Sequence, residues 1–121
     1  MAIKRILVVD DSATERHIIG EILTKQGFEV IFAESGEMGV AKAKQDKPDL
    51  VVMDVVMPGL NGFQATRAIS KDTETGQIPV LLCTTKDQET DKIWGMRQGA
   101  RDYLVKPINA AELLSKIAAL G

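Results

Sequence analysis

Five short apolar runs recur along this chain of 121 residues, and segments with helical spacing separate them. The runs are residues 6–9, 30–33, 50–53, 80–83 and 103–105. They are rich in Val, Ile and Leu and mostly do not alternate with polar residues, which is typical of strands covered on both faces. Buried strands that alternate with helices predict right-handed crossovers and a parallel sheet.

Capping signals agree with this division. Ser12 and Asn109 each stand three residues before a Glu, as helix N-caps do. Gly27 and Gly99 fit helix ends, where left-handed backbone geometry favours glycine. The predicted fold is α/β, a five-stranded parallel sheet of order 2-1-3-4-5 with helices on both faces, which makes a flavodoxin-like three-layer sandwich.

The composition predicts one soluble domain over residues 1–121, since 45% of residues are apolar and 26% are charged. A net charge of −2 argues against a nucleic-acid partner, which would need clustered excess cation. No run is long enough to span a membrane, and the opening residues turn acidic too soon for a signal peptide. The lone Cys83 suits a reducing compartment. We therefore expect a cytoplasmic protein without a membrane partner.

Residues able to bind a metal ion and a phosphoryl group follow four of the runs: Asp10, Asp11, Asp54, Thr84 and Lys106. Parallel strands release such residues at one edge of the sheet. Three carboxylates there suit Mg²⁺, with Mn²⁺ as an alternative ion. A metal-neutralised Asp54 could attack phosphorus, and Thr84 and Lys106 could contact phosphoryl oxygens. Each residue alone also has a structural explanation, such as helix capping or a solvated lysine.

The segments LVVDDS, VVMDVVMPGLNG, PVLLCTTK and GARDYLVKP together resemble the receiver domain of bacterial response regulators, which are CheY-like proteins. The match runs the full length of the chain. Two stretches, GLNGFQATRAISKD and TTKDQETDKIWGMRQGARDYL, further resemble stand-alone regulators of twitching motility. The resemblance implies a response regulator of a chemotaxis-like two-component phosphorelay, of the type that controls twitching motility by type IV pili. It implies a signalling protein rather than an enzyme.

The resemblance also implies roles for the acidic residues. Asp54 would accept phosphate from the phosphohistidine of a CheA-like sensor histidine kinase. Asp11, the Asp54 carboxylate and the backbone carbonyl of Val56 would hold Mg²⁺, and Asp10 would reach the ion through water.

By the same resemblance, Thr84 and Lys106 would bind the phosphoryl oxygens, and the Lys106–Pro107 peptide bond would be cis. Thr84 would move on phosphorylation and Tyr103 would turn inward. These shifts would remodel the face formed by the fourth helix, fifth strand and fifth helix, where a motor or effector protein would dock. Trp94 lies in or near this face, although core packing explains it equally well.

Several alternatives stay open at this point. The chain could drain phosphate from a shared kinase as a sink, or bind partners without phosphate. A dehalogenase-type, Mg²⁺-dependent aspartyl phosphatase would need a second acid where Val56 stands. In a flavodoxin-like FMN carrier, Asp10 and Asp11 would repel the phosphate of the cofactor. We expect a monomer, and dimerisation on phosphorylation is left open.

Overall fold

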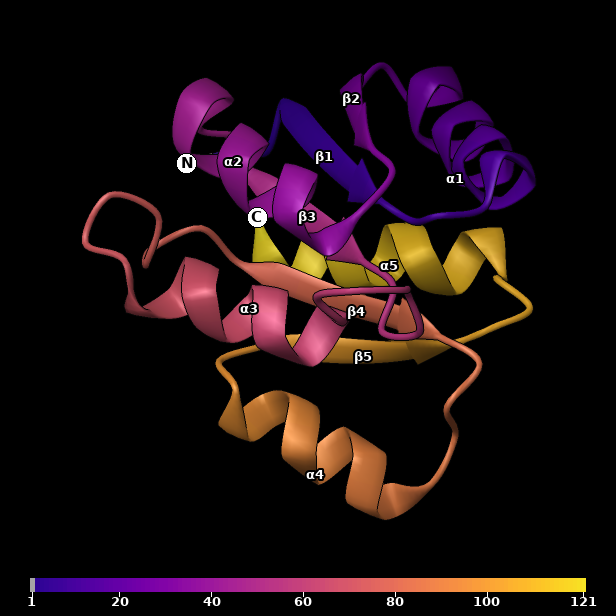
Figure 1. The fold of residues 1–121 in the computed structure, drawn as a ribbon. Helices are drawn as coiled ribbons and strands as arrows, with labels where there is room; N and C mark the ends of the chain where they lie inside the picture. Colours follow the sequence, from indigo (N-terminus) through magenta and orange to yellow (C-terminus); the bar gives the residue numbers. More distant parts are fainter. Residues whose placement is uncertain (1) are drawn as a thin grey trace.

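The computed structural model describes residues 2–121, in which five strands and five helices alternate without exception (Figure 1). The strands are β1 Arg5–Val9, β2 Glu29–Ala33, β3 Leu50–Met53, β4 Val80–Thr84 and β5 Asp102–Val105. The helices are α1 Ala13–Lys25, α2 Gly36–Asp46, α3 Gly62–Lys71, α4 Glu89–Arg97 and α5 Ala110–Leu120. All five predicted runs are strands, so the element order deduced from the sequence is confirmed.

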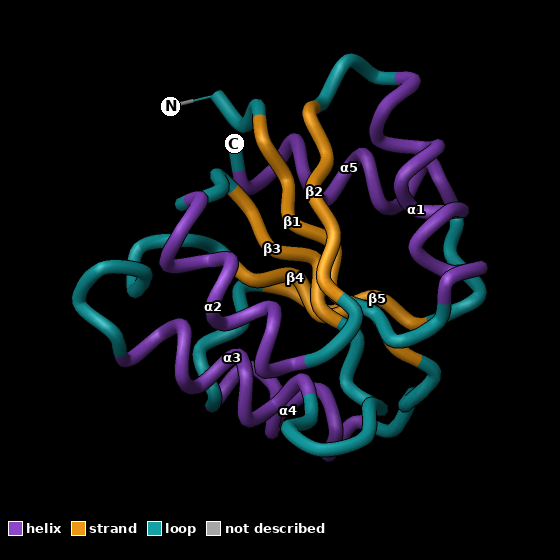
Figure 2. The backbone as a smooth tube through the Cα atoms, turned by 45° about the horizontal axis from the view of Figure 1, so that its top comes forward, coloured by secondary structure: helices purple, strands orange, loops and turns teal. Residues whose placement is uncertain are grey.

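The strands form one parallel sheet of order β2-β1-β3-β4-β5, as predicted. Helices α1 and α5 cover one face, and α2, α3 and α4 cover the other, which confirms the three-layer sandwich (Figure 2). Successive side chains of a strand point to opposite faces. Leu7 therefore packs in the core under α2 and α3, whereas Ile6 packs in the core under α1 and α5.

The three inner strands explain the continuous apolar runs, because every residue of β3 and β4 is buried, as are the last four residues of β1. The edge strand β2 is less covered, and its Phe32 is exposed. Cys83 lies inside β4, where burial raises the pKa of its thiol to about 12. It is therefore a small core residue, as the apolar run indicated. Among the described residues, no helix combines the length and hydropathy that crossing a membrane requires.

Both N-caps predicted from the sequence, Ser12 and Asn109, are present. Oγ of Ser12 accepts from the backbone N–H of Glu15, and Oδ1 of Asn109 accepts from the backbone N–H of Glu112. Gly27 and Gly99 have φ of +90° and +111°, so both adopt the left-handed geometry expected after a helix. The backbone N–H of Ser12 donates to Oδ1 of Asp10 at 2.9 Å, which ties the cap of α1 to the end of β1.

Helix α4 packs against the sheet through a single buried residue. Of its nine residues, all of which the structure describes, Gly95 alone is buried. A Cβ at Gly95 would lie 2.6 Å from Cδ1 of Leu82, so only glycine lets the helix approach β4 this closely. Ile93 and Trp94 are about half exposed, at 47% and 51%. Core packing, one of the two explanations for Trp94, is therefore excluded.

Candidate functional site

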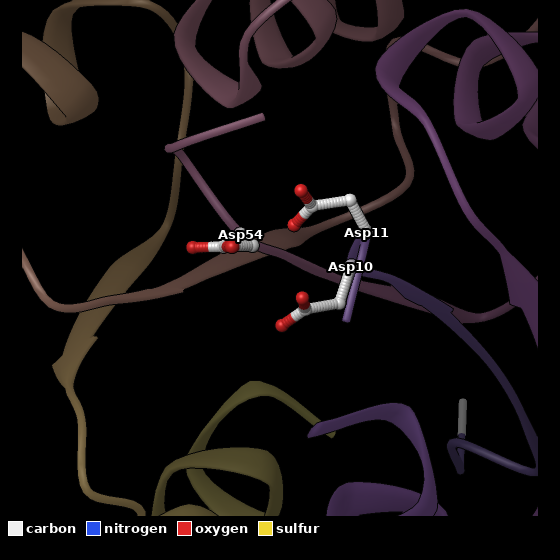
Figure 3. Close-up of side chains that lie close together, drawn as sticks. All are labelled: Asp10, Asp11 and Asp54. Atoms are coloured by element: carbon white, nitrogen blue, oxygen red, sulfur yellow. The ribbon is translucent and has the colours of Figure 1, made fainter. Parts of the chain in front are cut away.

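Three carboxylates gather at the carboxyl edge of the sheet (Figure 3). One oxygen each from Asp10, Asp11 and Asp54 lies within 4.8 Å of the others. The parallel register pairs Val9 with Met53, and the backbone N–H of Asp54 donates to the carbonyl of Val9. This register brings the residues after β1 and β3 together, as predicted from the sequence.

The donor set of this cluster fits a hard divalent cation. Asp10 and Asp54 are buried, whereas Asp11 is exposed, so the cluster opens to solvent on one side. Three carboxylates supply oxygen ligands only, and Mg²⁺ binds one or two carboxylates while it keeps several water molecules. The three aspartates present at this cluster therefore fit the ligand preference of Mg²⁺.

The carboxyl group of Asp54 is destabilised in its charged form. Burial raises the pKa of Asp54 above its usual value, and the negative charge of Asp10 raises it further. Lys106 and the backbone N–H of Val55, which donates to Oδ1 at 2.8 Å, oppose these effects only in part. A cation at the cluster would stabilise the ionised carboxylate, because it adds the positive charge that the site lacks.

The segment after Asp54 is held in place by its neighbours. Gly62 begins α3 so close to the carbonyl of Asp54 that a Cβ there would clash, and its N–H donates to the carbonyl of Val55. Oε2 of Glu37 accepts from the backbone N–H of Leu60, which ties the same segment to α2. The side chain of Val56 is exposed. The role of its carbonyl as a metal ligand stays a prediction.

Lys106 occupies the other side of the cluster and contacts three carboxylates. Its Nζ lies 2.7 Å from Oδ2 of Asp10, 3.4 Å from Oε1 of Glu15 and 3.7 Å from Oδ2 of Asp54. Asp10 is the closest of the three carboxylates, and it accepts a hydrogen bond from Nζ of Lys106. Burial lowers the pKa of Lys106, but the hydrogen bond that Lys106 donates to Asp10 and the negative charge of Asp54 outweigh this effect and raise the pKa.

Glu15 is the one carboxylate near Lys106 that sequence reasoning assigned only to helix capping. It lies in the first turn of α1, which starts at the same sheet edge as the cluster. The position of Glu15 in the first turn was the only sequence signal for this contact, because a side chain there can turn toward the carboxyl edge of the sheet. The Lys106–Pro107 peptide bond is cis, as the resemblance implied.

Thr84 and Tyr103 both hold the main chain of Lys86, in the connection between β4 and α4. Oγ1 of Thr84, which is fully buried, accepts from the N–H of Lys86 at 3.3 Å. The hydroxyl of Tyr103 donates to the carbonyl of Lys86 at 2.9 Å. Burial raises the pKa of Tyr103 to about 12, so the hydroxyl keeps its proton at neutral pH. Tyr103 is buried, so its ring already lies inward in this structure, whereas the resemblance implied an inward turn only on phosphorylation.

Comparison with known proteins identifies the family of this chain. Residues 6–118 match the family described as response regulator receiver domain. This chain belongs to that family. It is 61% identical over 116 residues to the protein PilH of Pseudomonas aeruginosa, and the match covers 96% of each chain.

Two solved structures of response regulator receivers share the fold. Chemotaxis protein CheY4 of Vibrio cholerae superimposes with a TM-score of 0.92 at 32% identity, over 99% of this chain and all of that chain. The receiver domain of the sensor histidine kinase PA1611 from Pseudomonas aeruginosa gives a TM-score of 0.90 at 28% identity, over 98% of each chain. That structure holds a magnesium ion coordinated in its active site cleft.

Membership in this receiver family fixes the general activity. Receiver domains are signalling modules of two-component systems, and they interact with histidine kinases and effector proteins. They bind Mg²⁺ at an acidic pocket, and this receiver has such a pocket in Asp10, Asp11 and Asp54. The CheY-like fold and the family match together argue against the two alternative functions considered from the sequence, a dehalogenase-type phosphatase and an FMN carrier.

Proposed function

We propose that this receiver is a stand-alone response regulator, one domain over residues 1–121, in which Asp54 accepts a phosphoryl group from the phosphohistidine of a CheA-like sensor histidine kinase. The observation that carries the proposal is the placement of Asp54. It is buried, lies against Asp10 and Asp11, and faces the ammonium group of Lys106. The protein acts as a signalling module with slow phosphoryl chemistry of its own, rather than as an enzyme with a separate substrate.

In the transfer, a carboxylate oxygen of Asp54 bonds to phosphorus as the bond from phosphorus to the histidine nitrogen breaks. Asp11, Asp54 and the Val56 carbonyl would hold Mg²⁺, or Mn²⁺ in its place, and Asp10 would reach the ion through water. The ion would supply positive charge that offsets the negative charge of the carboxylate and phosphoryl oxygens. Nζ of Lys106 already lies 3.7 Å from Oδ2 of Asp54, so it would contact a phosphoryl oxygen on Asp54 and neutralise part of the added charge.

The switch would start at Thr84. A phosphoryl group adds about 1.5 to 2 negative charges and new acceptor oxygens, which attract the Thr84 hydroxyl. Because Thr84 and Tyr103 both bind the main chain of Lys86, a shift of either residue moves the start of α4. The face of α4, β5 and α5 would then dock a motor or effector protein through the exposed Ile93 and its neighbours.

The proposed pathway is the control of twitching motility by type IV pili. It is supported by the 61% identity to PilH over 96% of each chain. The proposed kinase implies a cytoplasmic location, because histidine kinases phosphorylate their receivers there. We propose a monomer in the unphosphorylated state.

The test is acetyl phosphate with Mg²⁺, followed by intact mass and by Trp94 fluorescence. We expect a gain of about 80 Da in the wild type and none in Asp54→Asn. Asp46→Asn, which removes a carboxylate at the end of α2, is the matched control and should gain the same mass as the wild type. A phosphoryl adduct that survives in Asp54→Asn would remove Asp54 from the proposal.

A further inference from the structure

Arg16 lies near the start of α1 and reaches back to the end of β1. Its Nη1 donates to the backbone carbonyl of Asp10 at 2.7 Å, and its Nη2 lies 3.6 Å from Oε2 of Glu34, in the connection between β2 and α2. The Arg16 side chain is 17% exposed, whereas that of Glu34 is 68% exposed. The contact to Asp10 is therefore the stronger of the two, because it is a short, charge-assisted hydrogen bond and the other is an ion pair at the surface.

The hydrogen bond from Arg16 completes a set of contacts that hold every polar atom of Asp10. The backbone N–H of Asp10 donates to the carbonyl of Ala33 at 3.1 Å. Its Oδ1 accepts from the N–H of Ser12, and its Oδ2 accepts from Nζ of Lys106. Asp10 is therefore fixed at its main chain and at its carboxylate, and Arg16 is the residue that holds its carbonyl oxygen.

This carbonyl belongs to the peptide unit that carries Asp11. The peptide bond is planar, so the C=O of Asp10 turns together with the N–H and Cα of Asp11. Asp11 is exposed, so packing around its side chain does not fix its direction. In Figure 3 the side chains of Asp10 and Asp11 both extend from the end of β1 toward Asp54. A group that holds the Asp10 carbonyl therefore also sets the direction in which the Asp11 carboxylate leaves the chain.

The charge of Arg16 and its hydrogen bond act on a bound metal ion in opposite directions. A positive charge beside the cluster repels a cation, so removal of the charge alone would tighten the binding of Mg²⁺. Loss of the hydrogen bond would free the peptide unit of Asp11, whose carboxylate would then have to be ordered when the ion binds, and this weakens binding. Groups that orient metal ligands contribute about ten- to a hundredfold to metal affinity. The charge effect is smaller, because Glu34 pairs with the guanidinium and solvent screens it.

We propose that Arg16 is a positioning residue for the metal ion, which acts through the carbonyl of Asp10 and the direction of the Asp11 carboxylate. Arg16 itself would contact neither the ion nor the phosphoryl group. The proposal rests on the metal site proposed above, in which Asp11 and Asp54 bind Mg²⁺ directly. Because Arg16 lies in a helix rather than at a strand end, the pattern of acids at the sheet edge does not include it.

The test is a titration of the isotope-labelled, unphosphorylated protein with MgCl₂, followed by NMR, so that no phosphoryl transfer is involved. The amide signals of Asp11 and Val55 report the occupancy of the metal site, and Arg16→Met should bind Mg²⁺ about tenfold more weakly than the wild type. Methionine keeps the unbranched stem of arginine and a high helix propensity, so α1 is preserved. Before Mg²⁺ is added, the carbonyl carbon signal of Asp10 should shift in the variant, which reports the lost hydrogen bond.

Lys25→Met is the matched control for Arg16→Met. It removes the same charge from an exposed position in the last turn of α1, and it should bind Mg²⁺ as the wild type does. A merely structural role of Arg16 would lower the stability of the variant without lowering its affinity for Mg²⁺. The proposal is wrong if Arg16→Met binds Mg²⁺ as tightly as the wild type or more tightly.

Asp11→Asn separates the failure of this proposal from the failure of the metal site. The variant lacks a proposed ligand and should bind Mg²⁺ much more weakly than the wild type. If it does so while Arg16→Met binds normally, Arg16 has no positioning role and the metal site stands. If the wild type does not bind Mg²⁺, or if Asp11→Asn binds it as the wild type does, the proposed metal site is wrong and the role of Arg16 is wrong with it.

Discussion

Nζ of Lys106 donates to Oδ2 of Asp10 at 2.7 Å, whereas Oδ2 of Asp54 lies 3.7 Å from the same nitrogen. Without a metal ion, the ammonium group of Lys106 therefore neutralises the charge of Asp10 more than that of Asp54, the proposed phosphoacceptor. A metal ion bound to the aspartates would weaken the attraction of Asp10 for this ammonium group, and a phosphoryl group on Asp54 would attract it toward Asp54.

Lys106→Met tests this balance. Loss of the ammonium group leaves Asp10 and Asp54 buried without a cation, so the free energy of unfolding at pH 7 without Mg²⁺ should fall by about 2 to 3 kcal/mol. Urea denaturation measures the change, and added Mg²⁺ should restore part of the loss by binding to the folded state.

The control for Lys106→Met is Lys116→Met. Lys116 pairs with Asp102 at 3.1 Å, but both side chains are partly exposed, so this variant should lose less than about 1 kcal/mol. Equal losses in the two variants would show that Lys106 is no more important to the fold than a surface lysine.

Asp54→Asn should stabilise the metal-free protein at neutral pH. Because the pKa of Asp54 is raised in the folded state, the folded protein holds this proton more tightly than the unfolded chain does. The contribution of Asp54 to stability is therefore favourable at low pH and is lost as the pH rises through the raised pKa. Asn carries no charge, so the variant does not lose this stability as the pH rises. We expect its free energy of unfolding at pH 7 to exceed that of the wild type by about 1 kcal/mol, the scale of a like-charge contact near solvent.

Urea midpoints measured from pH 3 to pH 8 check the sign for Asp54→Asn. The two proteins should be nearly equal in stability at pH 3, below the usual aspartate pKa of 3.8, and should diverge as the pH rises above that value. A variant that is less stable than the wild type at pH 7 would contradict the raised pKa.

Glu15→Gln should tighten the binding of beryllofluoride, a mimic of the phosphoryl group, to the Mg²⁺-loaded protein. Oε1 of Glu15 lies 3.4 Å from Nζ of Lys106 and competes for it. Removal of this charge frees Lys106 for the fluoride ligands, and we expect an affinity gain of about threefold, the scale of a partly exposed ion pair. Trp94 fluorescence is the readout.

The effect of Glu15→Gln should vanish in the Lys106→Met background, because it acts through the lysine. Glu21→Gln removes an exposed charge from the same helix and should leave the affinity unchanged. A gain that persists without Lys106 would show a general electrostatic effect instead.

Tyr103→Phe removes the hydroxyl that donates to the carbonyl of Lys86. The free energy of unfolding should fall by about 1 kcal/mol, and the amide protons between β4 and α4 should exchange faster with solvent. Phosphoryl acceptance by intact mass should be unchanged, since Tyr103 does not contact Asp54 in the proposed mechanism. Unchanged exchange near Lys86 would contradict the role of this bond in holding the connection.

Most of the fold could be predicted from local patterns. Continuous apolar runs indicated strands buried on both faces, and Ser12 and Asn109 marked helix starts because their side chains cap the backbone three residues on. The acidic cluster was also predictable, because parallel strands release Asp10 and Asp54 at the same edge, whatever the details of packing.

The exposure of Trp94 could not be predicted in the same way. A tryptophan and an isoleucine on one short helix are consistent with a core or with a surface. Gly95, which allows α4 to touch β4 at one point, decides between them, and this contact depends on Leu82, a residue thirteen positions earlier.

The sequence by itself determined the order of strands and helices, the parallel sheet and the identity of the acids at its edge, since these follow from burial, capping and the hand of crossover connections. Only the tertiary structure decided that Lys106 pairs first with Asp10 and that Glu15 joins it. Such pairings depend on ångström-scale distances between side chains from different elements. Those distances are set by how the helices pack on the sheet, which no local pattern encodes.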